Sequence, residues 1–224
     1  MLWYKNWRET MPMLVFLQIF FVQFLFPNTW KIFSPDYSPA IFAIFMLYGF
    51  MLLGGSGIRT RLGFSRMKSS SIQSTLYTLS LPVTRRRLLL VRSAIGFLEM
   101  AGISIILAAL VLWVIGPRED LTVMAMGHTL LVVFAFGIGF YFFSTLLATF
   151  LHGAYFLLIC HCLFCVFVVF SERLGWLSAY MGLRTVFRSV SATGSLPWLQ
   201  MVTCVVLGGI CLLASIKIVE AQEY

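Results

Sequence analysis

The sequence predicts an all-α integral membrane protein with six transmembrane helices and both termini in the cytoplasm. The first observation is composition: 60% of the 224 residues are hydrophobic and 11% are charged. The second is a set of six apolar runs near the roughly 20 residues that cross a bilayer, and the third is an uneven distribution of positive charge. Soluble domains carry about 25% charged residues. The composition therefore excludes a water-soluble globular enzyme and a disordered chain.

Residues 1–12 are too polar to span a membrane, and they predict an amphipathic helix lying at the interface. Trp3, Trp7 and Met11 fall on one face of such a helix, where the indole rings reach the headgroup level. Pro12 ends or kinks it. The alternative is that these residues are a frayed start of the first span.

The first span is expected at Met13–Trp30, with Trp30 and Lys31 as interface anchors. A cleaved signal peptide is disfavoured because no small-x-small motif follows the apolar run. The same hydropathy predicts the other spans, which together with the first make residues 13–224 one membrane domain. They are expected at Ala40–Gly57, Ser93–Ile115, Thr122–Phe150, Ala154–Phe170 and Pro197–Ile218.

Positive charges set the predicted orientation. With the N-terminus inside, 11 of the 16 Lys and Arg residues fall on the cytoplasmic side and 5 on the outer side, as the positive-inside rule requires. The net charge of +8 is accordingly interpreted as topology, with no nucleic-acid partner expected. The segment 171–197 lies outside in this arrangement, and its mixed composition predicts short helices in or re-entering the outer interface.

The predicted cytoplasmic loop 58–92 carries eight positive charges and no acidic residue. Arg85, Arg86, Arg87 and Arg92 are expected to set orientation and to contact anionic lipids. Neither role explains the regular spacing of apolar residues that precedes these arginines in the same loop.

That pattern predicts a short amphipathic helix. Ile72, Leu76 and Leu79 follow i, i+4, i+7 spacing and form one apolar face. Pro82 ends the helix, because the residue before a proline is driven out of the α region. Such a helix lies on lipid or presents its apolar face to a soluble partner.

The stretch LYTLSLPVTRRRLLL, residues 76–90, resembles a motif of ABC-2-type transporter permeases. The tryptophan-rich start, the six spans and the long loop between spans two and three are similar to that family. The resemblance implies a type V exporter-like architecture in which this loop holds the coupling helix that docks on an ATPase. The residues it assigns to coupling are Ile72, Leu76, Tyr77, Leu79 and Pro82.

The resemblance also implies the partners. The chain has no GxxxxGK[ST] motif, so ATP and Mg²⁺ would bind a separate ATPase subunit, and this chain would hold no cofactor and be no enzyme. A second permease, identical or related, and membrane lipids complete the expected partners, in a bacterial inner (plasma) membrane. The alternative is a membrane-anchored protein that binds lipid or a partner without transport.

Two polar features within the spans are further candidates. Glu99, in the third span, is a candidate intramembrane polar site, because an acid at that depth is costly unless it is paired or hydrated. The alternative is that Glu99 and Arg92, seven residues apart on one face, both reach toward the inner interface. His161, Cys162 and Cys165 share one arc of the fifth span. They are a weak metal candidate, since structural zinc sites use four ligands. A less favoured hypothesis is an intramembrane enzyme using Glu99 with His161 or His152.

Overall fold

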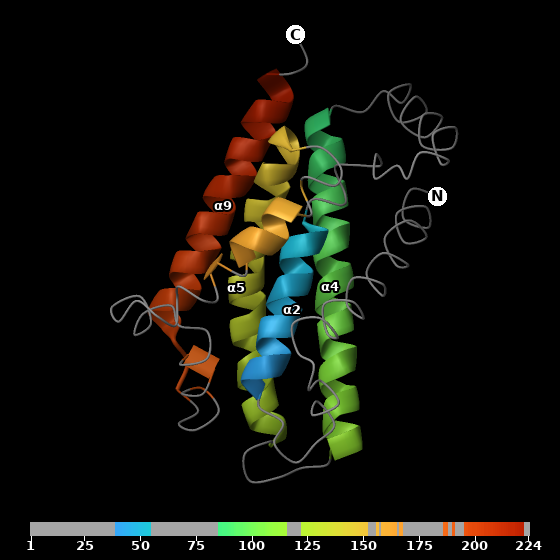
Figure 1. Ribbon diagram of the computed structural model, residues 1–224, viewed down its shortest axis with the longest axis vertical. Helices are drawn as coiled ribbons and strands as arrows, with labels where there is room; N and C mark the ends of the chain where they lie inside the picture. Colours follow the sequence, from blue (N-terminus) through green and yellow to red (C-terminus); the bar gives the residue numbers. More distant parts are fainter. Residues whose placement is uncertain are drawn as a thin grey trace, which may run out of the picture.

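The computed structural model describes residues 39–54, 85–115, 122–151, 156, 158–164, 166–167, 186–187, 190 and 195–221. Four long helices run along its long axis: α2 (Pro39–Leu53), α4 (Arg85–Ile115), α5 (Val123–Phe150) and α9 (Trp198–Ala221) (Figure 1). No strand occurs within these residues.

Three of the helices are long and apolar enough to cross a membrane. Their membrane-length stretches are Leu89–Trp113, Val123–Phe150 and Trp198–Ala221, and α2 adds a shorter apolar stretch, Phe42–Leu53. The predicted class of an all-helical membrane protein is therefore confirmed. The first predicted span and the interfacial helix 1–12 lie outside the described residues. Of the predicted outer segment 171–197, residues 186–187, 190 and 195–197 are described, and Val186, Phe187 and Val190 are helical and buried.

Helix boundaries follow local chemistry where the sequence carries it. Thr122 is the N-cap of α5, and its hydroxyl accepts a hydrogen bond from the backbone N–H of Ala125 at 3.1 Å. The helix ends at Phe150, where Leu151 turns extended. These are the limits that the sequence predicts for the fourth span.

α4 begins earlier than expected. The sequence places the start of the third span at Ser93, whereas the helix starts at Arg85 and includes the basic triplet. Hydropathy marks where a helix enters lipid rather than where it begins, and both Arg and Leu favour helix. Residues 85–92 of the predicted loop are thus continuous with the span.

The direction of each helix follows from its contacts. Met46 of α2 meets Ser104 of α4, and Phe50 meets Phe97, so these two helices are antiparallel. α2, α5 and α9 all run the same way, opposite to α4 (Figure 1). These relative directions agree with the alternation expected for spans two, three, four and six.

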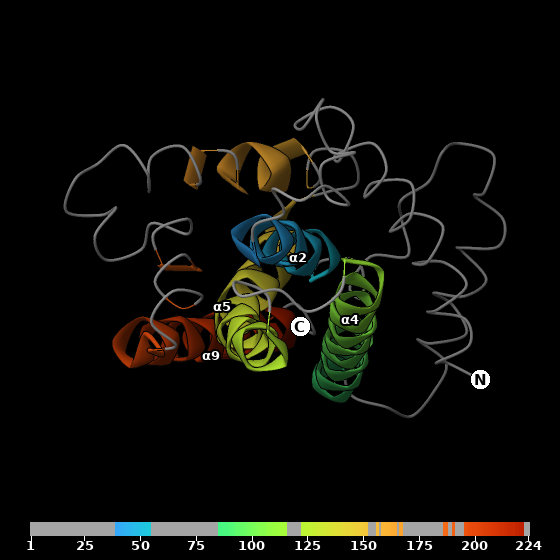
Figure 2. The same cartoon turned by 90° about the horizontal axis from the view of Figure 1, so that it is seen from below.

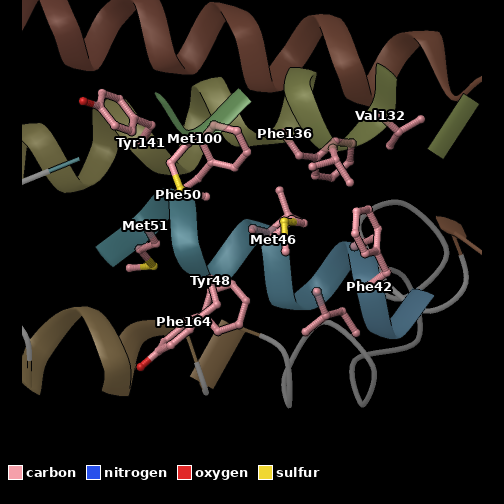
Figure 3. Packing of buried hydrophobic residues seen from close by; sticks show 14 of the residues in the cluster. Phe42, Met46, Tyr48, Phe50, Met51, Met100, Val132, Phe136, Tyr141 and Phe164 are labelled. Atoms are coloured by element: carbon pink, nitrogen blue, oxygen red, sulfur yellow. The ribbon is translucent and has the colours of Figure 1, made fainter. Parts of the chain in front are cut away.

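The core lies where α2 packs on α5. Viewed down the long axis, α5 lies between α2 and α9, with α4 beside it (Figure 2). Phe50 is fully buried, with its ring centroid 5.4 Å from that of Phe97 and 6.5 Å from that of Phe134. On the other side of α2, Tyr48 packs on Phe164, whose ring centroid is 5.2 Å away (Figure 3). Residues 156, 158–164 and 166–167, within the predicted fifth span, are helical.

The outer surfaces of α4 and α9 are strongly apolar. Large hydrophobic side chains on them are exposed, among them Leu98, Ile106, Trp113, Leu199, Val206 and Leu213. Such faces are unfavourable in water and suited to lipid tails. They therefore agree with a membrane-embedded protein.

Candidate functional site

The residues that the sequence assigns to ATPase coupling lie outside the described part of the chain. These are Ile72, Leu76, Tyr77, Leu79 and Pro82. The structure describes the residues that follow them, from Arg85 onward, and so shows how the segment joins the helical bundle.

The basic triplet forms the first turn of α4. Arg86 and Arg87 are exposed, and Arg92, two turns further on, is half-buried. Arg86 pairs with Glu220 in the last turn of α9, with 3.5 Å between Nη1 and Oε1. This ion pair joins the start of one membrane-length helix to the end of another.

The helix dipole gives this ion pair a physical basis. A helix N-terminus disfavours cations and a C-terminus disfavours anions, and the first turn of α4 contains no acid to balance its arginines. Glu220 and Arg86 each offset the other's unfavourable position. The side chain of Arg86 is 59% exposed and that of Glu220 is 42% exposed. Because solvent screens both charges, the pair contributes at most about 1 kcal/mol to stability. Its importance is positional: both helix ends lie at one end of the bundle.

Glu99 lies on α4 and is half-buried. Its Oε1 is buried, and no hydrogen-bond partner for it occurs among the described residues. The side chain stands one residue before the fully buried Met100 and one after the exposed Leu98. Glu99 therefore sits at the edge of the packed core, within the stretch Leu89–Trp113 that is long enough to span.

Tyr141 of α5 lies against the same part of α4. It is fully buried, and its hydroxyl occupies the place where a side chain on Gly96 would begin. The ring makes T-shaped contacts with Phe97 at 5.7 Å and with Phe142 at 5.4 Å between centroids. Its hydroxyl has no hydrogen-bond partner within the described residues. Sequence reasoning missed Tyr141, although a phenol inside an otherwise apolar span was a visible signal.

His161 is held by α2. Its Nδ1 and the hydroxyl of Tyr48 form a hydrogen bond of 2.9 Å, and the two rings pack edge to face at 5.8 Å. Cys160, next to it, is fully buried, whereas Cys162 is exposed. His161 is thus directed toward α2, whereas the adjacent Cys162 is exposed.

The described part of the chain contains no assembled set of ligands for the predicted metal site. No three His, Cys, Asp or Glu side chains come together there in a group able to hold a metal ion. The side chain of Cys165, the third member of the predicted cluster, and all of His152 lie outside the described residues. The hydrogen bond to Tyr48 gives His161 a structural role between two helices.

Comparison with known proteins identifies no relative. Neither a family model, nor a curated protein, nor a solved structure matches this chain. The indications of function are therefore the chain's own residues and the motif resemblance in residues 76–90.

Proposed function

We propose that this chain is the membrane-spanning permease subunit of an ATP-driven ABC-2-type exporter. It would cross a bacterial inner membrane six times with both termini in the cytoplasm. ATP and Mg²⁺ would bind a separate ATPase subunit, and the segment 58–92 would couple that subunit to the spans. A second permease, identical or related, would complete the translocation pathway.

The observation that carries the proposal is the continuity of α4. The helix runs without interruption from Arg85 to Ile115, whereas its membrane-length apolar stretch starts at Leu89. A displacement of the preceding segment would be transmitted along α4, because no break in the helix separates the two. The ion pair between Arg86 and Glu220 links the same end of α4 to α9.

This arrangement gives a coupling mechanism. Closure of the ATPase dimer would push the docked helix 71–80, which is joined to α4 at Arg85 by four residues of chain, 81–84. α4 would then shift against α5 at the contact between Gly96 and Tyr141. Rearrangement of these helices would alternate access between the two sides of the membrane.

The test is recovery of an ATP-hydrolysing partner. The affinity-tagged full chain is purified from its host membranes in mild detergent, and bound subunits are labelled with a photoreactive azido-ATP. We expect one labelled subunit of ABC ATPase sequence with the parent chain. Leu76→Asp with Leu79→Asp should release it, because burying one such side chain is worth about 1.5–3 kcal/mol.

The chain offers a matched control on the same helix. Ser74→Asp with Thr78→Asp adds the same two charges to the opposite face of the predicted helix, so it should keep the labelled subunit. Loss of the subunit in both double variants, or in neither, contradicts docking through the apolar face.

Exposed arginines favour a second candidate function, a membrane-anchored protein that binds lipid without transport. Arg86 and Arg87 lie in the first turn of α4 and are exposed. A cation close to an anionic membrane surface contributes about 1 kcal/mol to binding. The purification distinguishes the two functions. Co-purified anionic lipid without any azido-ATP-labelled subunit supports the second candidate and contradicts the first.

A further inference from the structure

Two oxygen atoms in the membrane-length helices lack hydrogen-bond partners among the described residues. One is Oε1 of Glu99 on α4, and the other is the hydroxyl oxygen of Tyr141 on α5; both atoms are buried. Buried polar groups are nearly always hydrogen-bonded, so two such atoms on neighbouring helices require a physical explanation.

Helix geometry brings the two groups to one place. The Tyr141 hydroxyl lies against Gly96, and Glu99 follows Gly96 by three residues on the same face of α4. Side chains in a helix lean toward its N-terminus, which here is the direction from Glu99 to Gly96. The Glu99 carboxyl group therefore points toward the turn of α4 that contains Gly96, which the Tyr141 hydroxyl contacts.

The surroundings disfavour a charge at this position. Phe97 packs on Tyr141, and Met100 beside Glu99 is fully buried. An ionised carboxylate with no donor is costly within a membrane span. A bound proton removes the charge and turns the carboxyl group into a donor for the phenol oxygen, whereas a metal ion needs several further oxygen ligands.

No other charged group in the described helices competes for this role. α2 contains no Asp, Glu, Lys, Arg or His, and the titratable groups of α5 are His128 and Tyr141. His128 lies 13 positions before Tyr141 on α5. Lys217 and Glu220 of α9 lie at the end of the bundle where Glu220 pairs with Arg86, and Arg86 is 13 positions before Glu99 on α4. Both separations amount to about 20 Å along a helix.

Further titratable groups lie on or near the neighbouring elements: Arg92, His161, Tyr48 and the cysteines Cys160, Cys162, Cys204 and Cys211. Arg92, on the same face of α4, is two turns nearer the helix start and half-buried. His161, in the helical residues beyond α2, is hydrogen-bonded to Tyr48. Neither Arg92 nor His161 is a hydrogen-bond partner of the Glu99 Oε1 or of the Tyr141 hydroxyl, since both of these atoms lack a partner among the described residues.

We propose that Glu99 and Tyr141 form a proton-binding site inside the membrane, between α4 and α5. A proton from the aqueous phase binds the Glu99 carboxylate, and the resulting O–H donates to the Tyr141 hydroxyl oxygen, while the phenol keeps its own proton. Packing of α4 on α5 favours the protonated form, and separation of the two helices releases the proton. The inference stands on the two unpartnered atoms and on the approach of the Tyr141 hydroxyl to Gly96, one turn from Glu99, and does not depend on the proposed transport function.

The experiment is infrared spectroscopy of the full chain in phosphatidylcholine and phosphatidylglycerol vesicles. At neutral pH we expect the carbonyl band of a protonated carboxylic acid, which Glu99→Gln removes. Tyr141→Phe should shift this band, because the hydrogen-bond acceptor is lost while the ring packing is kept. Glu220→Gln is the matched control: it also removes a carboxyl group, but at the bundle end, and should leave the band unchanged.

The outcomes separate clearly. Absence of the band in the parent at neutral pH, or its persistence in Glu99→Gln, overturns proton binding by Glu99. An unshifted band in Tyr141→Phe overturns the pairing. Circular dichroism checks that each variant is folded; if Glu99→Gln does not fold, the shift in Tyr141→Phe decides alone.

Discussion

The Thr145 hydroxyl of α5 hydrogen-bonds the carbonyl oxygen of Gly54, 2.8 Å away, at the end of α2. The same hydroxyl lies 2.9 Å from the carbonyl of Tyr141 in its own helix, so its proton is shared between two acceptors. The place where a Gly54 side chain would begin is filled by the Ser144 hydroxyl and the Tyr141 carbonyl. α2 is thus fastened to α5 by a backbone contact that only glycine allows.

Gly54→Ala should therefore destabilise the protein. The new methyl group would overlap backbone atoms of α5, and overpacking of this kind costs about 1–3 kcal/mol. Gly102→Ala is the control, since no atom lies within 4 Å of its added methyl, and it should be neutral or slightly stabilising. Thermal unfolding of the purified chain in detergent measures both. Equal melting temperatures for the two variants would contradict the close contact.

Adjacent glycines in α9 provide a second, internally matched test. A methyl group on Gly208 would lie 2.8 Å from the carbonyl oxygen of Ile138 in α5, whereas one on Gly209 would meet nothing within 4 Å. We expect Gly208→Ala to separate the two helices and lower the melting temperature, and Gly209→Ala to leave it nearly unchanged. The proposed packing fails if Gly209→Ala is the more damaging substitution.

Removing the Tyr48 hydroxyl should weaken the contact between α2 and the helical residues 158–164. Tyr48→Phe keeps the ring packing on Phe164 and deletes the hydrogen bond to His161, a loss of about 1 kcal/mol. Thr149→Val serves as the control, because its hydroxyl bonds only the Leu146 carbonyl of its own helix. Chemical denaturation in detergent compares them. A larger loss in Thr149→Val would argue against a role for Tyr48 between helices.

Side-specific labelling tests the orientation. In a background with the five native cysteines changed to alanine, Arg86→Cys and Glu220→Cys should react with an impermeant maleimide from the cytoplasmic side, since their parent side chains lie 3.5 Å apart at one bundle end. Trp198→Cys, at the other end of α9, should react from the outside only. Labelling of Arg86→Cys and Glu220→Cys from opposite sides would refute the arrangement.

Hydropathy predicted the positions of several helices. The apolar run predicted the limits of α5, and α9 lies within a few residues of the predicted sixth span. The start of α4 was placed too late, because polar arginines continue a helix as well as leucines do. The predicted coupling helix lies outside the described residues and stays a prediction.

The candidate site was less accessible from sequence. Glu99 stood out as an acid in a span, but its neighbour Tyr141 comes from a different helix, and only packing brings them together. Helical spacing grouped His161 with two cysteines, whereas the structure turns it toward Tyr48, 113 positions away. The spacing of residues in the sequence shows which side chains share a face of one helix. It does not show which other helix packs against that face.

The aromatic cluster joining α2, α4 and α5 has a consequence for biogenesis. Phe50, Phe97 and Tyr141 all belong to the part of the chain that the ribosome completes before α9 emerges. Because synthesis proceeds from the N-terminus, these three helices can associate first and present the surface around Ile138 on which Gly208 later docks. Maturation of this protein is therefore expected to pass through an intermediate in which α2, α4 and α5 are already packed together, with the docking of α9 as a later step.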